Sequence, residues 1–280
     1  MAIILDGKAL AEKVRTEVRA EIEQSGIKPG LAVVIVGDNP ASRIYVDSKK
    51  KDCLICGIES VEITLPADAG EKRLLEEVEK LNKRPDIHGI LVQLPLPKGY
   101  DEQRVIQTIS PDKDVDAFHF LNVGRIMNGD YAFLPCTPAG VMEILEHYGI
   151  DPAGKHCVVV GRSNIVGKPQ AMLLLHKNAT VTICHSRTPD LGAMTRQADI
   201  LVAAVGKVNL ITADMVKPGA VVIDVAMNHD EKGKLCGDVD FPGVEPVSSH
   251  ITPVPGGVGP MTRAVLMQNT LTAAKRLLGK

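Results

Sequence analysis

The hydrophobic positions in the first half of the chain alternate between two periodicities. Residues 7–26 carry an apolar residue every fourth position, the stripe of an amphipathic helix, and these residues are Leu10, Val14, Val18 and Ile22. The next run, LAVVIVG at 31–37, is apolar without interruption, as in a strand covered on both faces. The same order repeats with helices at 40–56, 70–83 and 101–109, and strands at 60–65 and 87–94. This alternation predicts a parallel α/β sheet.

A second set of alternating elements follows a stretch, residues 110–136, in which this rhythm is lost. A helix is predicted to begin at CTPAGVMEIL, where Thr137 can cap it and Pro138 lies in the first turn. Strands are then predicted at 156–161, 179–184, 198–206 and 220–226. This pattern indicates a second doubly wound unit, and the helical segment 260–278 can return to the first unit after the loop PVPGGVGP.

The predicted fold class is therefore α/β with two domains and a cleft between them. Residues 1–136 plus 264–280 would form a parallel α/β catalytic domain, and residues 137–263 a Rossmann-like nucleotide-binding domain. A chain of 280 residues with 45% hydrophobic content is long enough to build two cores.

Net charge and hydropathy restrict the possible partners. The formal net charge of -2 provides no broad basic field for nucleic acid. No apolar run approaches the roughly 20 residues that span a bilayer, and the start MAIILDGKALAEK lacks the features of a signal peptide. We therefore expect a cytoplasmic protein that binds neither nucleic acid nor membranes.

The six cysteines are scattered, and reduced thiols fit their positions best. Cys53 and Cys56 form a CxxC sequence, but neither a second CxxC nor a nearby histidine pair completes a zinc site. The segment has the pattern of a helix face, so we expect no metal.

A glycine-containing turn follows the strand that ends the run HCVVVG. Gly161 and Gly167 flank a strand-to-helix turn whose backbone amides can face a pyrophosphate. The spacing is GxxxxxG and departs from the GxGxxG fingerprint, so two glycines that only serve a packed turn remain an alternative. The next strand ends in ICHSRT, without an acid for a ribose 2′-hydroxyl. Ser186, Arg187 and Arg162 offer donors for a 2′-phosphate instead, which favours NADP over NAD, unless the arginines are solvated loop charges.

Candidate catalytic residues lie in the first half of the chain. Tyr45 and Lys49 are four residues apart and share one helix face. The spacing YxxxK also occurs in short-chain dehydrogenases, but there it follows the glycine-rich turn, whereas here it precedes that turn. From spacing alone, a surface lysine beside a half-buried tyrosine explains the pair better. Gln93 ends the strand of GILVQLPLP, at the edge where open α/β sheets bind ligands, and Asp114 and Asp116 follow in PDKDVDAFH, where each could also cap a turn.

Together these blocks resemble the bifunctional methylenetetrahydrofolate dehydrogenase/cyclohydrolase family over nearly the whole chain. The matching blocks, in the family's order, are IYVDSKKK, GILVQLPLP, PDKDVDAFH, FLPCTPAGV, VVVGRSNIVGKP, TICHSRT and PVPGGVGPMT. The resemblance implies two α/β domains, NADP on the second, a tetrahydrofolate derivative in the cleft, and a homodimer.

The resemblance also implies roles for individual residues. Lys49 would be the central catalytic group, Gln93 its hydrogen-bonding partner, Tyr45 a wall against the folate and Asp116 the anchor of the pterin. Further substrate contacts would come from Leu94, Pro255, Gly256 and Gly257. Arg162 and Ser186 would bind the 2′-phosphate, and the remaining cofactor contacts would come from Gly161, Ser163, Ile165, Val166, Gly167, His185 and Arg187.

Three positions depart from the family pattern: Ala117 replaces a glycine, Ala226 lies where DVG is usual, and AVG at 204–206 replaces ATG. Ala117 could weaken folate binding if its position requires a positive φ. The implied activities are NADP-dependent oxidation of 5,10-methylenetetrahydrofolate and hydrolysis of the methenyl product to 10-formyltetrahydrofolate. A monofunctional dehydrogenase of the same fold and a catalytically silent NADP- or folate-binding regulator are the alternatives.

Overall fold

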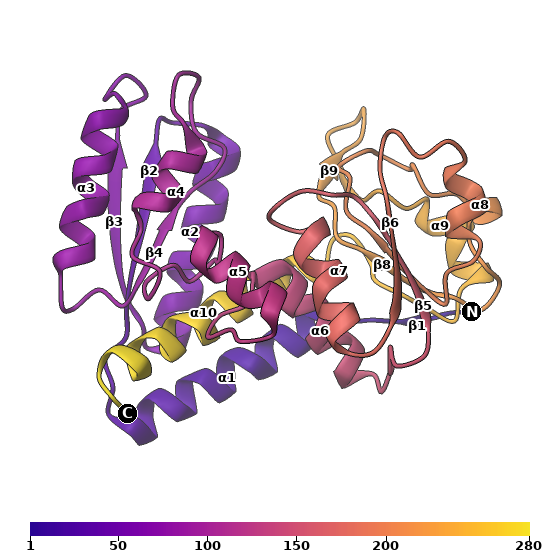
Figure 1. The fold of residues 1–280 in the computed structure, drawn as a ribbon, viewed down its shortest axis with the longest axis horizontal. Helices are drawn as coiled ribbons and strands as arrows, with labels where there is room; N and C mark the ends of the chain where they lie inside the picture. The colour runs from indigo at the N-terminus through magenta and orange to yellow at the C-terminus, as the bar shows by residue number, and fades with distance from the viewer. The chain divides into compact units, whose positions relative to one another are not determined.

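The computed structural model describes residues 1–280, apart from the side chain of Ala41, and it divides into two compact units. Residues 13–136 and 263–280 form the first, which we call the three-stranded unit after its sheet. Residues 1–12 and 137–262 form the second, the six-stranded unit (Figure 1). The prediction of a two-domain α/β protein with parallel sheets is confirmed.

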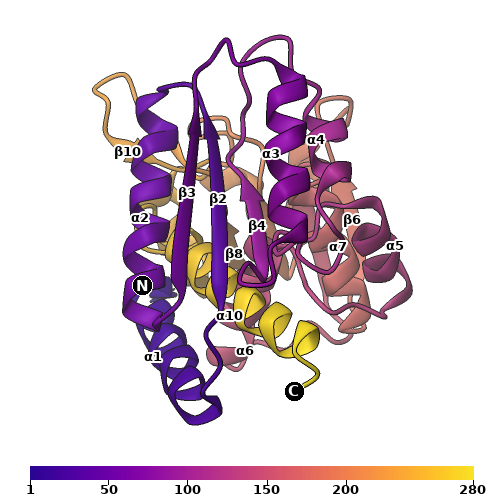
Figure 2. The same cartoon turned by 90° about the vertical axis from the view of Figure 1, so that its left-hand side faces the viewer.

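The sheet of the three-stranded unit has the order β3-β2-β4, with parallel pairing throughout (Figure 2). Its strands are β2 (Gly30–Val36), β3 (Glu59–Leu65) and β4 (Gly89–Val92). Every residue of the central strand β2 is buried, as the uninterrupted apolar run predicts. Because β2 and β4 are parallel, their carboxyl ends lie at the same edge of the sheet, where side chains from the segments that follow them can meet.

Helices complete the three-stranded unit. They are α2 (Pro40–Cys56), α3 (Glu71–Lys83), α4 (Glu102–Thr108) and α5 (Phe120–Asn128), together with parts of α1 (Gly7–Ser25) and α10 (Val258–Leu277), two helices that contain residues of both units. In α3, Leu74, Val78 and Leu81 are buried and pack with strands β2 and β4 in one core. The recurrence of these apolar residues every three or four positions explains why this segment is a helix with one buried face.

The six-stranded unit carries a parallel sheet of order β1-β11-β8-β7-β5-β6. Its strands are β1 (Ile3–Ile4), β5 (His156–Val160), β6 (Thr180–Cys184), β7 (Ile200–Ala203), β8 (Val221–Asp224) and β11 (His250–Ile251). The chain moves from β5 to β6 on one side and then to β7 on the other. The strand order thus reverses at β5, and open α/β sheets bind ligands at the carboxyl ends beside such a switch point.

The remaining elements of this unit are short, apart from two helices. They are α6 (Cys136–His147), α7 (Gly167–His176), α8 (Leu191–Thr195), α9 (Phe241–Val244), the 3₁₀ turns Ala213–Met215 and Glu245–Val247, and a hairpin of β9 (Asn228–His229) with β10 (Leu235–Cys236). Within the described part of the chain, no helix is both long and apolar enough to span a bilayer.

The structure differs from the sequence-based expectations in several places. Residues 1–12 group with the six-stranded unit because Ile3 and Ile4 pair with His250 and Ile251 at its edge. The stretch without periodicity contains the helix α5, and the cap residue His119 accepts a hydrogen bond at Nδ1 from the backbone N–H of Leu121 in its first turn. Helix α6 begins at Cys136, so Thr137 lies inside its first turn instead of capping it, and the Thr137 hydroxyl bonds that of Thr262.

Candidate active site

A lysine and a glutamine meet at the carboxyl edge of the three-stranded sheet. Lys49 on α2 donates a hydrogen bond from Nζ to Oε1 of Gln93, at 2.9 Å. Gln93 follows β4, and its backbone N–H donates a hydrogen bond to Val34 O of β2. Its side-chain Nε2 donates a hydrogen bond to Leu94 O, at 2.7 Å. The second bond fixes which end of the amide faces the lysine. Helix α2, which carries Lys49, follows β2, and Gln93 follows β4. Because β2 and β4 pair in parallel, Lys49 and Gln93 meet although they are far apart in the sequence.

An acidic loop approaches the same lysine. Asp116 accepts a hydrogen bond from the thiol of Cys136, at 3.4 Å, and it interacts electrostatically with Lys49. Asn269 of α10 donates from Nδ2 to the carbonyls of Val115 and Leu134, both at 2.8 Å. One buried amide therefore joins the loop that carries Asp116 to the segment that carries Cys136. Sequence reasoning missed both Cys136 and Asn269.

Burial shifts the pKa of Lys49 and the pKa of Asp116, and in each case the neighbouring groups act against this shift. Burial lowers the pKa of Lys49, while the nearby Asp116 and Cys136 act to raise it. Burial raises the pKa of Asp116, and Lys49 and the Cys136 thiol act against that rise. Desolvation penalises the charged form of each group, so it favours a neutral amine at Lys49. A neutral amine has a lone pair and can accept a proton.

Two of the three aspartates of PDKDVDAFH, Asp114 and Asp116, have different surroundings. Asp114 is buried and accepts bonds from His119 N and Asn122 Nδ2, both at 2.8 Å, and burial raises its pKa to about 6. Asp114 therefore organises its own turn, whereas Asp116 interacts electrostatically with Lys49. Between them and the following helix, Ala117 is fully buried with a φ of 57°, in the left-handed region that glycine adopts more readily. Tyr45, one turn before Lys49 on α2, is partly exposed.

The glycine turn lies at the switch point of the six-stranded sheet. Gly161 has a φ of 133°, and a Cβ there would be 2.3 Å from Ala204 O. A Cβ on Gly167 would be 2.3 Å from Gly161 O. Ser163 Oγ accepts from the amides of Val166 and Gly167, both at 3.2 Å, where α7 begins. Both glycines are thus required by close backbone packing, and the turn directs a helix amino terminus along the sheet edge, a geometry that suits a pyrophosphate.

Candidate 2′-phosphate donors come from the two neighbouring strands. Val160 pairs with Cys184, so the segments after β5 and β6 leave the sheet at the same level. Arg162, Ser186 and Arg187 are exposed there. Nδ1 of His185 accepts a hydrogen bond from the backbone N–H of Arg187, at 3.1 Å. The register therefore supplies two guanidinium groups and a hydroxyl beside the glycine turn, where Ile165 is also exposed.

A carboxylate that sequence reasoning missed holds the loop after β7. Asp238 is fully buried and accepts bonds from the amides of residues 205–207, at 2.6, 3.1 and 2.6 Å. Asp224 at the end of β8 accepts from the amides of Asp238 and Val239, and burial raises its pKa to about 6. The loop fixed in this way includes the AVG segment and continues from Ala204, which contacts Gly161. The sequence signal for this pair is Asp224, which ends the apolar run of β8.

The glycine loop before α10 packs against the start of α1. Gly256 has a φ of 113°, and its carbonyl accepts from Lys8 N at 2.9 Å. Gly257 N bonds Pro253 O, and a Cβ on Gly7 would be 2.0 Å from Gly257 O. Pro255 follows a cis peptide bond. Pro255, Gly256 and Gly257 thus lie in the six-stranded unit, in a loop whose path depends on close backbone contacts.

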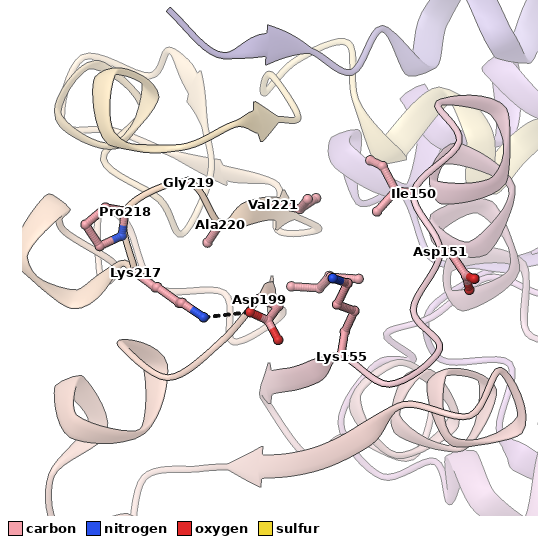
Figure 3. A pocket seen from close by; sticks show the side chains of 10 residues that line it. Ile150, Asp151, Lys155, Asp199, Lys217, Pro218, Gly219, Ala220 and Val221 are labelled. Atoms are coloured by element: carbon pink, nitrogen blue, oxygen red, sulfur yellow. Dashed lines mark hydrogen bonds and ion pairs between the residues drawn. The ribbon is translucent and has the colours of Figure 1, made fainter.

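A further pocket lies at the opposite edge of the six-stranded sheet, near the amino ends of β7 and β8 (Figure 3). Lys217 pairs with Asp199 there, at 2.7 Å, so the carboxylate is already neutralised. Ligands of open α/β sheets bind at the carboxyl ends, which excludes this pocket as the nucleotide site. Among the described residues, no group of three or more His, Cys, Asp or Glu could hold a metal ion.

Taken together, a switch-point glycine turn and a separate lysine, glutamine and aspartate site define a two-domain α/β enzyme of the dehydrogenase type. The tetrahydrofolate dehydrogenase/cyclohydrolase family models match the chain: the catalytic domain at residues 5–116 and the NAD(P)-binding domain at residues 135–278. The chain therefore belongs to this family.

Individual relatives agree over their full length. The bifunctional protein FolD of Polaromonas naphthalenivorans is 62% identical over 278 residues, which cover 98% of this chain and 99% of the relative. The crystal structure of a bifunctional methylenetetrahydrofolate dehydrogenase/cyclohydrolase from Campylobacter jejuni matches with a TM-score of 0.96 and 49% identity, over 99% of each chain. The enzyme of Trypanosoma brucei, solved with NADP and an inhibitor, matches with a TM-score of 0.95 and 39% identity, over 100% of this chain and 99% of that one. The predicted family, both activities and the cofactor NADP are confirmed.

Proposed function

We propose that Lys49 is the proton acceptor in the hydrolysis of methenyltetrahydrofolate, and that Gln93 holds its amine in line. The carrying observation is the 2.9 Å hydrogen bond between Lys49 Nζ and Gln93 Oε1 at a partly buried site. Water attacks the methenyl carbon and must lose a proton, and the tetrahedral adduct then opens with proton delivery to a folate nitrogen. A neutral amine can take the first proton and return it in the second step.

The oxidation step makes a different demand on the same site. A folate nitrogen lone pair drives the hydride from the methylene carbon, so positioning contributes more than base catalysis. Bound NADP would supply the hydride acceptor for this step. We assign the pterin anchor to Asp116 and the wall beside the folate to Tyr45, with further contacts from Leu94 and from the loop at Pro255, Gly256 and Gly257. The charge of Asp116 next to Lys49 supports an anchor for a polar ring.

For the cofactor we propose that Arg162 and Ser186 bind the 2′-phosphate, because both are exposed at the same level of two paired strands. The glycine turn with Gly161, Ser163, Ile165, Val166 and Gly167 would hold the pyrophosphate, and His185 and Arg187 would border the adenosine end. The residues assigned to catalysis and to the pterin anchor then belong to the three-stranded unit, and the residues assigned to NADP belong to the six-stranded unit.

We also propose a homodimer in the cytoplasm. Strand β3 forms one edge of the three-stranded sheet, and Ile44, Leu54 and Ile55 of α2 are exposed apolar side chains. A sheet edge beside apolar helix residues suits a second copy of the same chain. All six cysteines, each within the described residues, are free thiols, which fits a reducing compartment. Sedimentation of the purified protein measures the mass and decides the oligomeric state.

The substitution Lys49→Met tests the proposed function. It keeps the side-chain stem and removes the amine, so hydrolysis of added methenyltetrahydrofolate should fall by on the order of a hundredfold or more, and NADPH formation should fall less. Lys51→Met, at an exposed position of the same helix, is the matched control and should retain both rates. If Lys49→Met hydrolyses the methenyl substrate at the wild-type rate above background, the base lies elsewhere.

A further inference from the structure

A buried asparagine of α10 holds two segments that are distant in the sequence. Asn269 is 7% exposed, and its Nδ2 donates hydrogen bonds to Val115 O and to Leu134 O, both at 2.8 Å. An amide nitrogen carries two hydrogens, so each carbonyl receives one of them. All three residues belong to the three-stranded unit. The side chain of Asn269 therefore ties both segments to one helix.

The two carbonyls need a donor of this kind. Val115 and Leu134 lie outside the helices and strands, so no helical or ladder pattern supplies a hydrogen bond to their carbonyls. Val115 is fully buried, and a buried carbonyl without a partner costs free energy. Asn269 therefore stabilises one particular path of the backbone at both points.

Both segments lead to the carboxylate of Asp116. Asp116 follows Val115 directly, and Cys136 comes two residues after Leu134. The thiol of Cys136 has one proton and two acceptors within reach, Val115 O at 3.5 Å and Asp116 Oδ1 at 3.4 Å. Asn269 already donates to Val115 O, and an ionised carboxylate is the stronger acceptor. The thiol proton is thus directed to Asp116.

We propose that Asn269 is a positioning residue that fixes the Asp116 carboxylate for the pterin of the folate substrate, a role that rests on the proposed function of Asp116. Asn269 acts at two points. It holds the backbone one residue before Asp116, and it holds the segment whose thiol bonds the carboxylate.

Exposure separates the two roles. Asp116 is only partly buried, so part of its side chain remains open to a ligand, whereas Asn269 is buried. Asn269 therefore acts on folate through Asp116. A displacement of an anchor by about 1 Å can lower a rate by about a hundredfold, so the hydrogen bonds of Asn269 have a consequence beyond stability.

The first experiment compares Asn269→Leu with Thr270→Val in the full-length enzyme. Asn269→Leu keeps the approximate volume and removes the donors. The KM for added methenyltetrahydrofolate should rise about tenfold, and the KM for NADP should stay within about twofold of wild type, because the residues assigned to NADP lie in the other unit. Thr270→Val is the matched control and should retain both values. Thr270 is also buried in α10, but its hydroxyl bonds Leu266 O of the same helix, at 2.7 Å.

The second experiment measures the order of the Asp116 segment without folate. Amide hydrogen exchange with mass spectrometry follows residues 113–118, which include the Ala117 N–H that bonds Asp114 O at 3.0 Å. Exchange should be about tenfold faster in Asn269→Leu and unchanged in Thr270→Val, and strand β2 should exchange as in wild type. If Asn269→Leu is not fully folded at the temperature of the measurement, Asn269→Ala replaces it under the same criteria.

The third experiment combines Asn269→Leu with Asp116→Ala. Substitutions of residues that act through one another are not additive. In the Asp116→Ala background, Asn269→Leu should therefore change the KM for methenyltetrahydrofolate by less than about twofold. An undiminished effect in that background would mean that Asn269 acts on folate by another route, which overturns the proposal.

Wild-type exchange of residues 113–118 and a wild-type KM for methenyltetrahydrofolate in Asn269→Leu also overturn the proposal, as do equal rises of the KM for folate and for NADP. Failure of the proposed function gives a different result. If exchange is faster in Asn269→Leu but Asp116→Ala binds folate as tightly as wild type, Asn269 positions Asp116 as proposed and the assignment of Asp116 as the pterin anchor fails.

Discussion

The two candidate sites of this enzyme are built in different ways. In the three-stranded unit, Lys49, Gln93 and Asp116 are held by contacts between side chains, and burial changes the proton affinities of Lys49 and Asp116. In the six-stranded unit, the shape of the turn comes from backbone packing at Gly161 and Gly167, while Arg162 and Ser186 are exposed. One site therefore depends on functional groups and the other on the path of the main chain.

The difference teaches where each site is vulnerable. Truncation of a side chain in the first site should lower the reaction rates, whereas truncation of Arg162 or Ser186 in the second site should lower only the preference for NADP over NAD. An added methyl group at a packed glycine disturbs the second site directly. Because the sites belong to separate units, damage to the cofactor turn should spare a reaction that uses no cofactor. Hydrolysis of added methenyltetrahydrofolate is that reaction.

The largest expected effect is that of Gly161→Ala. The new Cβ would meet Ala204 O at 2.3 Å, at a φ of 133°, so the turn must shift. NADPH formation should fall by about a hundredfold or more, while hydrolysis of added methenyltetrahydrofolate stays within about twofold of wild type, since positioning of the cofactor does not enter that step. Both rates are measured in one sample at two wavelengths.

A matched control is Gly124→Ala in α5, where a Cβ would have nothing within 4 Å. This variant should retain both rates. If Gly161→Ala lost hydrolysis as severely as NADPH formation, the sites would not be independent and the comparison between them would fail.

A smaller effect on both reactions is expected for Asp116→Ala. An anchor for the pterin serves oxidation and hydrolysis alike, and loss of a bond to a charged group should weaken folate affinity about tenfold to a hundredfold. Fluorescence titration with the folate substrate measures this affinity. Asp112→Ala, in the same motif but exposed, is the control. Wild-type affinity and rates in Asp116→Ala would make Asp116 a turn residue.

The smallest effect concerns Arg162→Ala, because the residue is exposed and would bind only the 2′-phosphate. The KM for NADP should rise about tenfold through loss of a charge-assisted bond, and activity with NAD should stay nearly unchanged. Steady-state kinetics with both cofactors measure the difference. Equal losses with NADP and NAD would contradict the assignment and indicate a structural role.

The sequence predicted the elements that have a long and uniform pattern. The apolar run of β2 and the stripe of α3 each match their predicted ranges within a residue. The short strands β1 and β11 and the helix α5 were missed, because two paired residues or a capped loop helix leave no period to detect. The amino-terminal residues were assigned to the other domain for the same reason.

The candidate site could be predicted only where a residue stood out from its surroundings. Gln93 interrupts an apolar strand, and the structure brings it to Lys49. Spacing alone could not separate Lys49 from a surface lysine, since its partners come from other elements. Asn269 and Asp238 were missed because they act on backbone groups. A polar residue inside an apolar helix, as at Asn269, is the signal that could have revealed one of them.

The central claim is that the Lys49 amine, with its pKa lowered by burial, accepts the proton in hydrolysis. The most direct measurement is the pH dependence of the hydrolysis of added methenyltetrahydrofolate by the wild-type enzyme, corrected for the uncatalysed rate. A protonated amine cannot accept a proton. The account predicts that the rate falls as the pH drops through a pKa below that of an ordinary lysine, and that Lys49→Met loses this limb. A rate independent of pH across that range, or a limb that persists in Lys49→Met, would contradict it.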